Sequence, residues 1–401
     1  MSTLTFDILL EACRPGGPSC YSSRTELEPA GGRQASVAPA KFVGPRGNES
    51  VYAYERRFVD GVERQAVLID SKQSQLNRAE AALVQAIAEG DTLIGRVPRI
   101  EVVYDREGSE ERYSDLELPH RAFDGHIRAG TIDGTPVTEV AAYRALRDAS
   151  PANARPLLEA SPATLVFGGW DSSRAARQGR WRSVLVGEVI GICADGGVPA
   201  KKGGARVDPV GMSVVVPGKV LKELADAQRG ELSAKNYANL AKEAGGAKGE
   251  VVSASALNLG GIPPSLTALT GVACERVIRA HVLSFAALRQ LRFGAGLEGD
   301  VACRALLAAF ALDALARSDA ELSLRANCDL VETGPSAVTL DRRHGNRDDL
   351  EALSIGEADA LLAAALGRAE ELAGVSWHGV VLVVRGNPDI IAGAVDDDEE
   401  A

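Results

Sequence analysis

The part of the sequence with the clearest chemistry is an arginine cluster that follows Asp171. Residues 172–187 contain four arginines and no acidic residue, although the whole chain carries 44 Lys plus Arg against 55 Asp plus Glu. Guanidinium groups match phosphate oxygens better than lysine does. The cluster therefore predicts a contact with the sugar-phosphate chain of a nucleic acid, and the alternative is a solvated basic turn. Its members are Arg174, Arg177, Arg180 and Arg182.

Strand geometry strengthens the prediction for the last two arginines. If residues 180–182 enter a strand, alternation puts Arg180 and Arg182 on one face and Trp181 on the other. Two strand steps separate the arginines by roughly 6.6 Å. That spacing is comparable to the separation of neighbouring phosphates in an extended single strand, so a single-stranded ligand is favoured.

A second polar segment, Ser71–Arg78, directly follows an apolar run that ends at Asp70. It contains two cations and no acid, and it opens a helical pattern. A helix N-terminus offers free N–H groups and the positive end of the helix dipole, which suits a phosphate. The alternative is a capped, solvated helix start. The candidate residues here are Lys72, Ser74, Gln75, Asn77 and Arg78.

A glycine-rich loop further along adds three cations, Lys201, Lys202 and Arg206, near the arginine cluster in sequence. The rest of the sequence contains no clear motif for a metal or cofactor site. The histidines and cysteines have no metal-ligand spacing, and Gly294–Gly299 matches a dinucleotide motif without the strand that should precede it. We therefore expect neither a metal nor a cofactor.

The composition sets the class of protein. The 401 residues are 45% hydrophobic and 25% charged, as in soluble globular proteins. The net charge of −11 excludes a general binder of polyanions, so any nucleic-acid contact must come from a local basic patch. The first residues lack a basic n-region, and no apolar run reaches the ~20 residues that span a bilayer. We expect a cytoplasmic protein.

Hydrophobic periodicity predicts a mixed α/β chain, with strands and helices that alternate around one sheet. Predicted strands are Ala66–Asp70, Arg99–Tyr104, Pro162–Gly168, Ser183–Cys193, Glu321–Glu332, Ala337–Leu340 and Val380–Arg385. Predicted helices begin at Ser71 and cover about Pro119–Ala129, Thr138–Ala149, Lys219–Ala244, Val301–Arg317 and Ile355–Leu372.

We expect a single domain over residues 1–395, followed by an acidic, disordered tail at 396–401. Residues 11–50 are rich in Gly, Pro and Ser and predict an irregular surface segment. Residues from about 195 to 250 predict an insertion with too few large apolar residues for a core of its own.

Several ordered sequence blocks resemble a known family. They are Val67–Arg78, His120–Ala122, Pro162–Ser172, Arg182–Ser183, Leu259–Pro264 and Ala287–Phe293. Together they resemble the backbone subunit, of the RAMP superfamily, found in type I-G (formerly I-U) CRISPR effector complexes. The blocks span roughly residues 66–293, so most of the chain is covered.

The resemblance implies an α+β fold with an RNA-recognition-like, ferredoxin-like palm and inserted finger and thumb elements. It implies a non-catalytic, CRISPR RNA-binding subunit that polymerises along the spacer of the guide and presents it for pairing with target DNA in antiviral defence. The implied partners are the CRISPR RNA, target DNA, further copies of the chain, a guide-processing and capping subunit, a large subunit and a recruited helicase-nuclease.

Two other functions stay open at this stage. The first is a RAMP-type, metal-dependent endoribonuclease, for which Asp171 is the candidate acid, although no second acid or histidine accompanies it in sequence. The second is an interaction protein that binds no nucleic acid.

Overall fold

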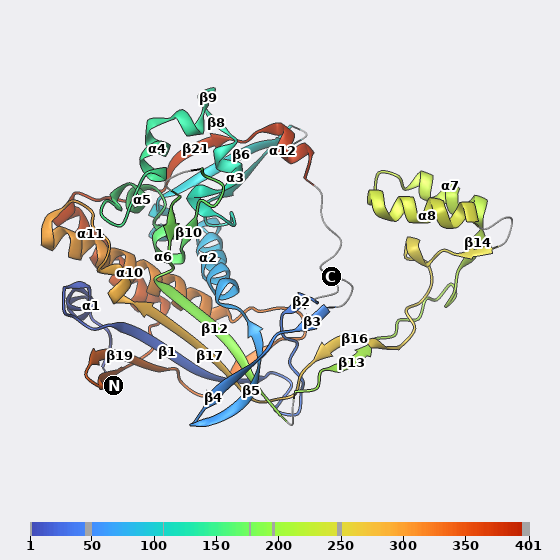
Figure 1. Ribbon diagram of the computed structural model, residues 1–401, viewed down its shortest axis with the longest axis horizontal. Coiled ribbons are helices and arrows are strands. Elements are labelled where there is room, and N and C mark those ends of the chain that lie inside the picture. The colour runs from blue at the N-terminus through green and yellow to red at the C-terminus, as the bar shows by residue number, and fades with distance from the viewer. Residues whose placement is uncertain are drawn as a thin grey trace.

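The computed structural model describes residues 2–44, 50–106, 108–175, 178–194, 197–246 and 251–394. At its centre lies an eight-stranded sheet with the order β20-β19-β1-β17-β12-β5-β4, in which β18 also pairs with β1 (Figure 1). Every pairing in this sheet is antiparallel. The bounds are Cys20–Pro29 (β1), Tyr54–Val59 (β4), Val62–Asp70 (β5), Leu185–Cys193 (β12), Cys274–Ser284 (β17), Leu330–Glu332 (β18), Ala337–Arg343 (β19) and Asn346–Leu350 (β20).

The connections within this sheet are those of a ferredoxin-like unit. Along the chain the unit runs β1, α2, β12, β17, α10, β19, which is the strand–helix–strand–strand–helix–strand series. In space its four strands lie in the order β19-β1-β17-β12. The fourth strand (β19) and the third (β17) therefore flank the first (β1), and the second (β12) lies at the outer edge of the unit. The β4–β5 hairpin extends the sheet beyond β12. The expected ferredoxin-like α+β fold is therefore present.

Helix α2 (Lys72–Ala88) and helix α10 (Gly296–Glu321) pack together on one face of the sheet. Ser71 caps α2, because its hydroxyl accepts a hydrogen bond from the Ser74 N–H at 3.2 Å. Leu76, Ala79 and Leu83 then recur at helical spacing and are buried. Helix α10 is buried from Gly299 to Leu315 on all sides, because α1 (Phe6–Cys13) and α11 (Ile355–Ala373) cover it as well.

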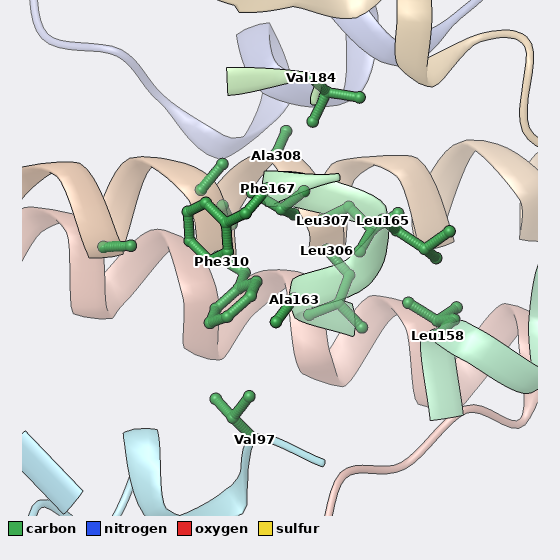
Figure 2. Close-up of a cluster of buried hydrophobic side chains, with 14 of the residues drawn as sticks. Val97, Leu158, Ala163, Leu165, Phe167, Val184, Leu306, Leu307, Ala308 and Phe310 are labelled. Carbon is green, nitrogen blue, oxygen red and sulfur yellow. The ribbon is translucent and has the colours of Figure 1, made fainter. Parts of the chain in front are cut away.

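The main hydrophobic core lies where short helix α6 (Pro162–Phe167) meets α10 (Figure 2). The ring of Phe310 contacts Phe167 edge to face at 6.0 Å between centroids, and Trp377 at 5.7 Å. Helix α6 is buried at every position. The apolar run 162–168 therefore forms a fully buried helix, and the strand predicted there is wrong, since apolar runs this short do not distinguish the two.

A smaller sheet stands beside the helices, with the order β7-β6-β21-β8-β9 (Figure 1). The late strand β21 pairs in parallel with the early strand β6, which ties the end of the described chain to its first half. The bounds are Arg99–Arg106 (β6), Ser109–Ser114 (β7), Thr131–Ile132 (β8), Thr135–Pro136 (β9) and Val380–Arg385 (β21). Around it lie α3 (Gly125–Arg128), α4 (Ala141–Arg147), α5 (Arg155–Ala160), α12 (Pro388–Ala392) and the 3-10 turns Ile94–Arg96, Arg121–Phe123 and Val137–Glu139.

Between β12 and β17 the chain leaves the sheet as a long arm, residues 197–246 and 251–271 (Figure 1). Strands β13 (Ala200–Gly203) and β16 (Ser265–Gly271) pair at its base, and β14 (Val215–Pro217) and β15 (Val251–Ser253) pair near its tip. Helices α7 (Gly218–Ala227) and α8 (Ala234–Gly246) form the tip, with the 3-10 turn Ser255–Leu257 beside them. The tip has a small core of its own, formed by Leu221, Ala225, Leu240, Ala254 and Leu257. The expectation that this insertion lacks a core is therefore wrong.

Two further expectations need correction. Residues 11–50 are not irregular throughout, because β1 lies in the middle of the main sheet and β2 (Lys41–Val43) pairs with β3 (Ser50–Tyr52). The strand predicted over 321–332 is confined to β18. The tail at 396–401 lies outside the described residues. The predicted strands at 99–104, 183–193, 337–340 and 380–385 are confirmed, as are the helices at 301–317 and 355–372.

Asp115 gives the fold a measurable pH dependence. Its side chain is fully buried and accepts a hydrogen bond from the Ile100 N–H at 3.2 Å. Burial raises the pKa of Asp115 to about 7, so the folded state binds this proton more tightly than the unfolded state. The stability that this carboxyl contributes is complete below pH 4 and is lost as the pH rises toward 7.

We expect the unfolding free energy of Asp115→Asn, measured relative to that of the wild type, to rise by about 2–3 kcal/mol from pH 5 to pH 8. The reason is that the carboxyl of the wild type ionises over this range and the amide does not. Denaturant unfolding of both proteins at the two pH values measures this change. A stability difference that stays constant with pH would contradict the prediction.

Candidate nucleic-acid interface

The arginine cluster forms a short hairpin. Strand β10 (Gly169–Trp170) pairs with β11 (Arg180–Trp181), and Trp170 lies opposite Arg180. Arg180 and Arg182 are exposed, whereas the indole of Trp181 is buried. Strand β11 ends at Trp181, so Arg182 lies just beyond it, and the exposed, buried, exposed pattern of residues 180–182 agrees with the predicted alternation. Neither Arg180 nor Arg182 forms an ion pair with a described residue, so both guanidinium groups are available to a phosphate.

Trp170 is the neighbour that the sequence analysis missed. It is 46% exposed, and the Arg180 guanidinium lies 4.6 Å from the centroid of its ring. The other two tryptophans, Trp181 and Trp377, are buried. An exposed indole under an arginine offers a flat surface for a nucleobase beside a cation for its phosphate. The position of Trp170 directly before the arginine cluster is the sequence feature that could have identified it as a candidate.

Arg174, the first arginine of the cluster, differs from Arg180 and Arg182. The guanidinium of Arg174 donates to a carboxylate oxygen of Asp148 at 2.6 Å and to the Arg147 carbonyl at 3.1 Å. Hydrogen bonds from Arg147 and Arg174 lower the pKa of Asp148. Arg174 therefore anchors the hairpin to the end of α4. Arg177 lies outside the described residues.

Most of the candidate side chains at the start of α2 bond Asp70, whose carboxylate is completely buried. It accepts hydrogen bonds from Ser74 at 2.8 Å and from Gln75 at 2.6 Å. The Arg78 guanidinium donates to both of its oxygens, at 2.9 and 3.1 Å. Burial raises the pKa of Asp70, but the hydrogen bonds from Arg78 and Gln75 outweigh burial and hold that pKa below its usual value.

These contacts divide the candidates at the helix start into two groups. Gln75 is buried and also bonds the ring of His281 at 3.0 Å, and Arg78 donates to the carbonyls of Ser323 and Leu324 as well. Ser74, Gln75 and Arg78 therefore hold the fold together here. Lys72 and Asn77 remain exposed, and Lys72 forms no ion pair within the described part of the chain.

The remaining three candidates lie on the arm. Lys201 and Lys202 are exposed on β13, and Arg206 is exposed beyond it, where its backbone pairs with Ile262. The structure does not bring them together with the hairpin, because the arm extends away from the body that carries β10 (Figure 1). Cations on the body and cations on the arm thus form two separate groups.

The sheet face opposite α2 and α10 is not the basic surface. Its outward residues include Arg24, Glu26 and Ser22 on β1 and Ile278 and Ala280 on β17. Its arginines are paired: Arg57 bonds Glu188 at 2.8 Å, and Arg276 bonds Glu26 at 2.5 Å. Strands β1 and β17 present no aromatic ring on that side, so exposed rings for stacking lie elsewhere.

Asp171, the candidate acid of a nuclease, is held in the hairpin. Its carboxylate is buried and accepts a hydrogen bond from Arg128 at 3.0 Å. Across the described ranges, no group of three or more His, Cys, Asp or Glu side chains is arranged to hold a metal ion. Asp171 thus has a structural partner in Arg128.

The fold and this surface define a ferredoxin-like α+β protein that presents, on one hairpin and on one arm, cations with no ion-pair partner among the described residues. Residues 22–195 match the model of a family described as CRISPR-associated protein GSU0053 (Cas_GSU0053). The matched part runs from β1 to the end of β12 and contains Arg180, Arg182 and Lys72. This match supports a CRISPR-associated protein with a role in CRISPR defence. No curated protein matches the sequence.

Over the ranges that the structure describes, none of the helices has both the length and the apolar character needed to cross a lipid bilayer.

Proposed function

We propose that this protein is a non-catalytic, CRISPR RNA-binding backbone subunit that holds the guide by its sugar-phosphate chain. The observation that carries the proposal is that Arg180 and Arg182 are exposed and form no ion pair with a described residue, on a hairpin within the family-matched region. Contacts to phosphates fix the position of a strand without reading its bases. The bases then stay free to pair with target DNA.

The shape of the arm supports the proposal that several copies assemble along one guide. The arm projects from the body (Figure 1). It also carries large exposed apolar side chains, of which Val198, Val210 and Leu266 are 81%, 89% and 79% exposed. We propose that the arm contacts the next copy of the chain while Lys201 and Lys202 hold the RNA between them.

The resemblance suggests the other members of the complex: a guide-processing and capping subunit, a large subunit and a helicase-nuclease that cleaves the target. In this proposal the chain itself cuts nothing and works in the cytoplasm. The acidic body is consistent with the role, because a negative mean field repels stray RNA and leaves only the basic patches to bind it.

Binding of RNA without sequence preference tests the proposal. We expect the purified chain to bind two unrelated single-stranded RNAs of equal length with the same affinity, and we expect that affinity to fall steeply with salt. Filter binding between 50 and 300 mM salt measures both. The ratio of absorbance at 260 and 280 nm shows whether RNA copurifies. Absence of RNA binding at low salt would refute the proposal and leave an interaction protein.

A further inference from the structure

Two cysteines face each other where the arm leaves the main sheet. Cys193 is the last residue of β12, Cys274 is the first residue of β17, and the arm lies between them in the chain (Figure 1). Their Cα atoms are direct partners in the antiparallel pairing of the two strands. Both residues are free thiols in the structure. The base of the arm therefore carries a pair of thiols, one on each of the strands that support it.

The register of the two strands places these thiols at a separation that a disulfide can span. The Ala194 N–H donates to the Ala273 carbonyl at 3.1 Å, so the adjacent pair, Cys193 and Cys274, is a non-hydrogen-bonded pair. In such a pair the Cα atoms lie about 4.5 Å apart, and the side chains leave the sheet on the same face. A disulfide joins Cα atoms that are about 4.4–6.8 Å apart. Little backbone movement is therefore needed to join the two sulfurs.

The surroundings of the pair leave space for its sulfur atoms. A Cβ atom at Gly191 would collide with the sulfur of Cys274, so the glycine is what allows that sulfur to lie there. Both thiols pack in one hydrophobic cluster. Burial, and then the nearby thiols of Cys193 and Cys328, raise the pKa of Cys274 to about 12. The pair is therefore protonated at neutral pH and reacts slowly.

We propose that Cys193 and Cys274 form a redox modification site, at which a low-molecular-weight disulfide such as oxidised glutathione produces an intramolecular disulfide. The thiolate of Cys274, which is the more exposed of the two, attacks one sulfur of oxidised glutathione. The glutathione disulfide breaks, a mixed disulfide forms at Cys274, and one glutathione leaves as a thiol. The thiolate of Cys193 then attacks the Cys274 sulfur and displaces the second glutathione. The two cysteines lose two electrons and two protons, which the two glutathione thiols gain.

The disulfide fixes the base of the arm to the sheet. The chain enters the arm from β12 and returns into β17, and the register of these strands shifts between Ile192 and Cys193. A bond across the pair at this shift closes the arm into a covalent loop, so the two strands no longer separate there. The redox state thus sets how firmly Lys201 and Lys202 are held relative to the main sheet. This inference goes beyond the proposed function and does not depend on RNA binding.

Peptide mapping of the full-length protein tests the proposal. The reduced protein is incubated with oxidised glutathione until the reaction stops, the remaining thiols are blocked, and the peptides are analysed by mass spectrometry without reduction. We expect a peptide that links Cys193 to Cys274, with the loss of two hydrogen atoms, from most of the molecules. Hydrogen exchange at the Ala194 amide should become at least about tenfold slower, because the disulfide suppresses opening at this pair. Dithiothreitol should reverse both changes.

Cys20 is the matched control within the same chain. It is also half-buried on a strand, but Ser284 and not a cysteine lies opposite it. Any product at Cys20 should therefore be a mixed disulfide with glutathione. Cys328→Ser should leave the bond between Cys193 and Cys274 unchanged, whereas Cys193→Ser should stop the reaction at the mixed disulfide on Cys274.

The outcomes that contradict the inference are distinct. A disulfide between Cys274 and Cys328, a glutathione that stays on Cys274 in the wild type, or no reaction in the folded protein would each overturn it. Thermal unfolding verifies that the variants are folded, and the peptide map of the wild type decides the question if one of them is not. None of these outcomes affects the proposed function, because RNA binding is measured separately on the reduced protein.

Discussion

Replacing Arg180 and Arg182 together with alanine is expected to lower the affinity for single-stranded RNA at least tenfold at 100 mM salt. Both guanidinium groups are exposed and make no ion pair with a described residue, so the fold loses little when they are removed. Each charge-assisted contact to a phosphate contributes about 1.5–3 kcal/mol. Because two phosphates lose their partners, the slope of log affinity against log salt should become shallower by about 1.4.

The matched control for this variant removes two arginines that already have partners. Arg33 pairs with Glu28 at 2.9 Å, and Arg368 pairs with Glu371 at 3.1 Å, both on the surface. The double variant Arg33→Ala, Arg368→Ala changes the net charge by the same amount and should keep the affinity and slope of the wild type. Equal losses in the two double variants would show that net charge, and not the hairpin, governs binding.

Replacing Asp70 with asparagine is expected to destabilise the protein by about 3 kcal/mol. The carboxylate is completely buried and forms ion pairs with both Arg78 and Arg325, which meet it from α2 and from the segment before β18. An amide in its place accepts fewer hydrogen bonds and leaves two guanidinium groups without a counter-charge. Denaturant unfolding at pH 7 measures the change.

A surface pair provides the comparison for Asp70. Glu63 pairs with Arg56 at 3.7 Å, and both side chains are more than half exposed. Glu63→Gln should therefore change the unfolding free energy by no more than about 0.5 kcal/mol. If Asp70→Asn cost no more than Glu63→Gln, the buried network would not hold this corner of the fold, and Arg78 would be free for another role.

The contacts of Asp70 correct the phosphate site that the sequence predicted at the start of α2. A segment with two cations and no acid at a helix start suggested a phosphate site, but the acid that uses Arg78 stands one residue before that segment. Its second partner, Arg325, is 255 positions away in sequence. Only the folded chain shows that Gln75 and Arg78 face inward and that Lys72 faces solvent.

The sequence by itself determined the features that depend on neighbours along the chain. The period of apolar residues determined helices α2, α10 and α11, and alternation predicted that Arg180 and Arg182 are exposed on either side of the buried Trp181. Tertiary structure decided which cations remain free, that residues 162–167 form a buried helix, and that Cys193 lies opposite Cys274 at the base of the arm. The reason is that partners for a charge, and for a thiol, come from segments far apart in sequence, which only the packed sheet and helices bring together.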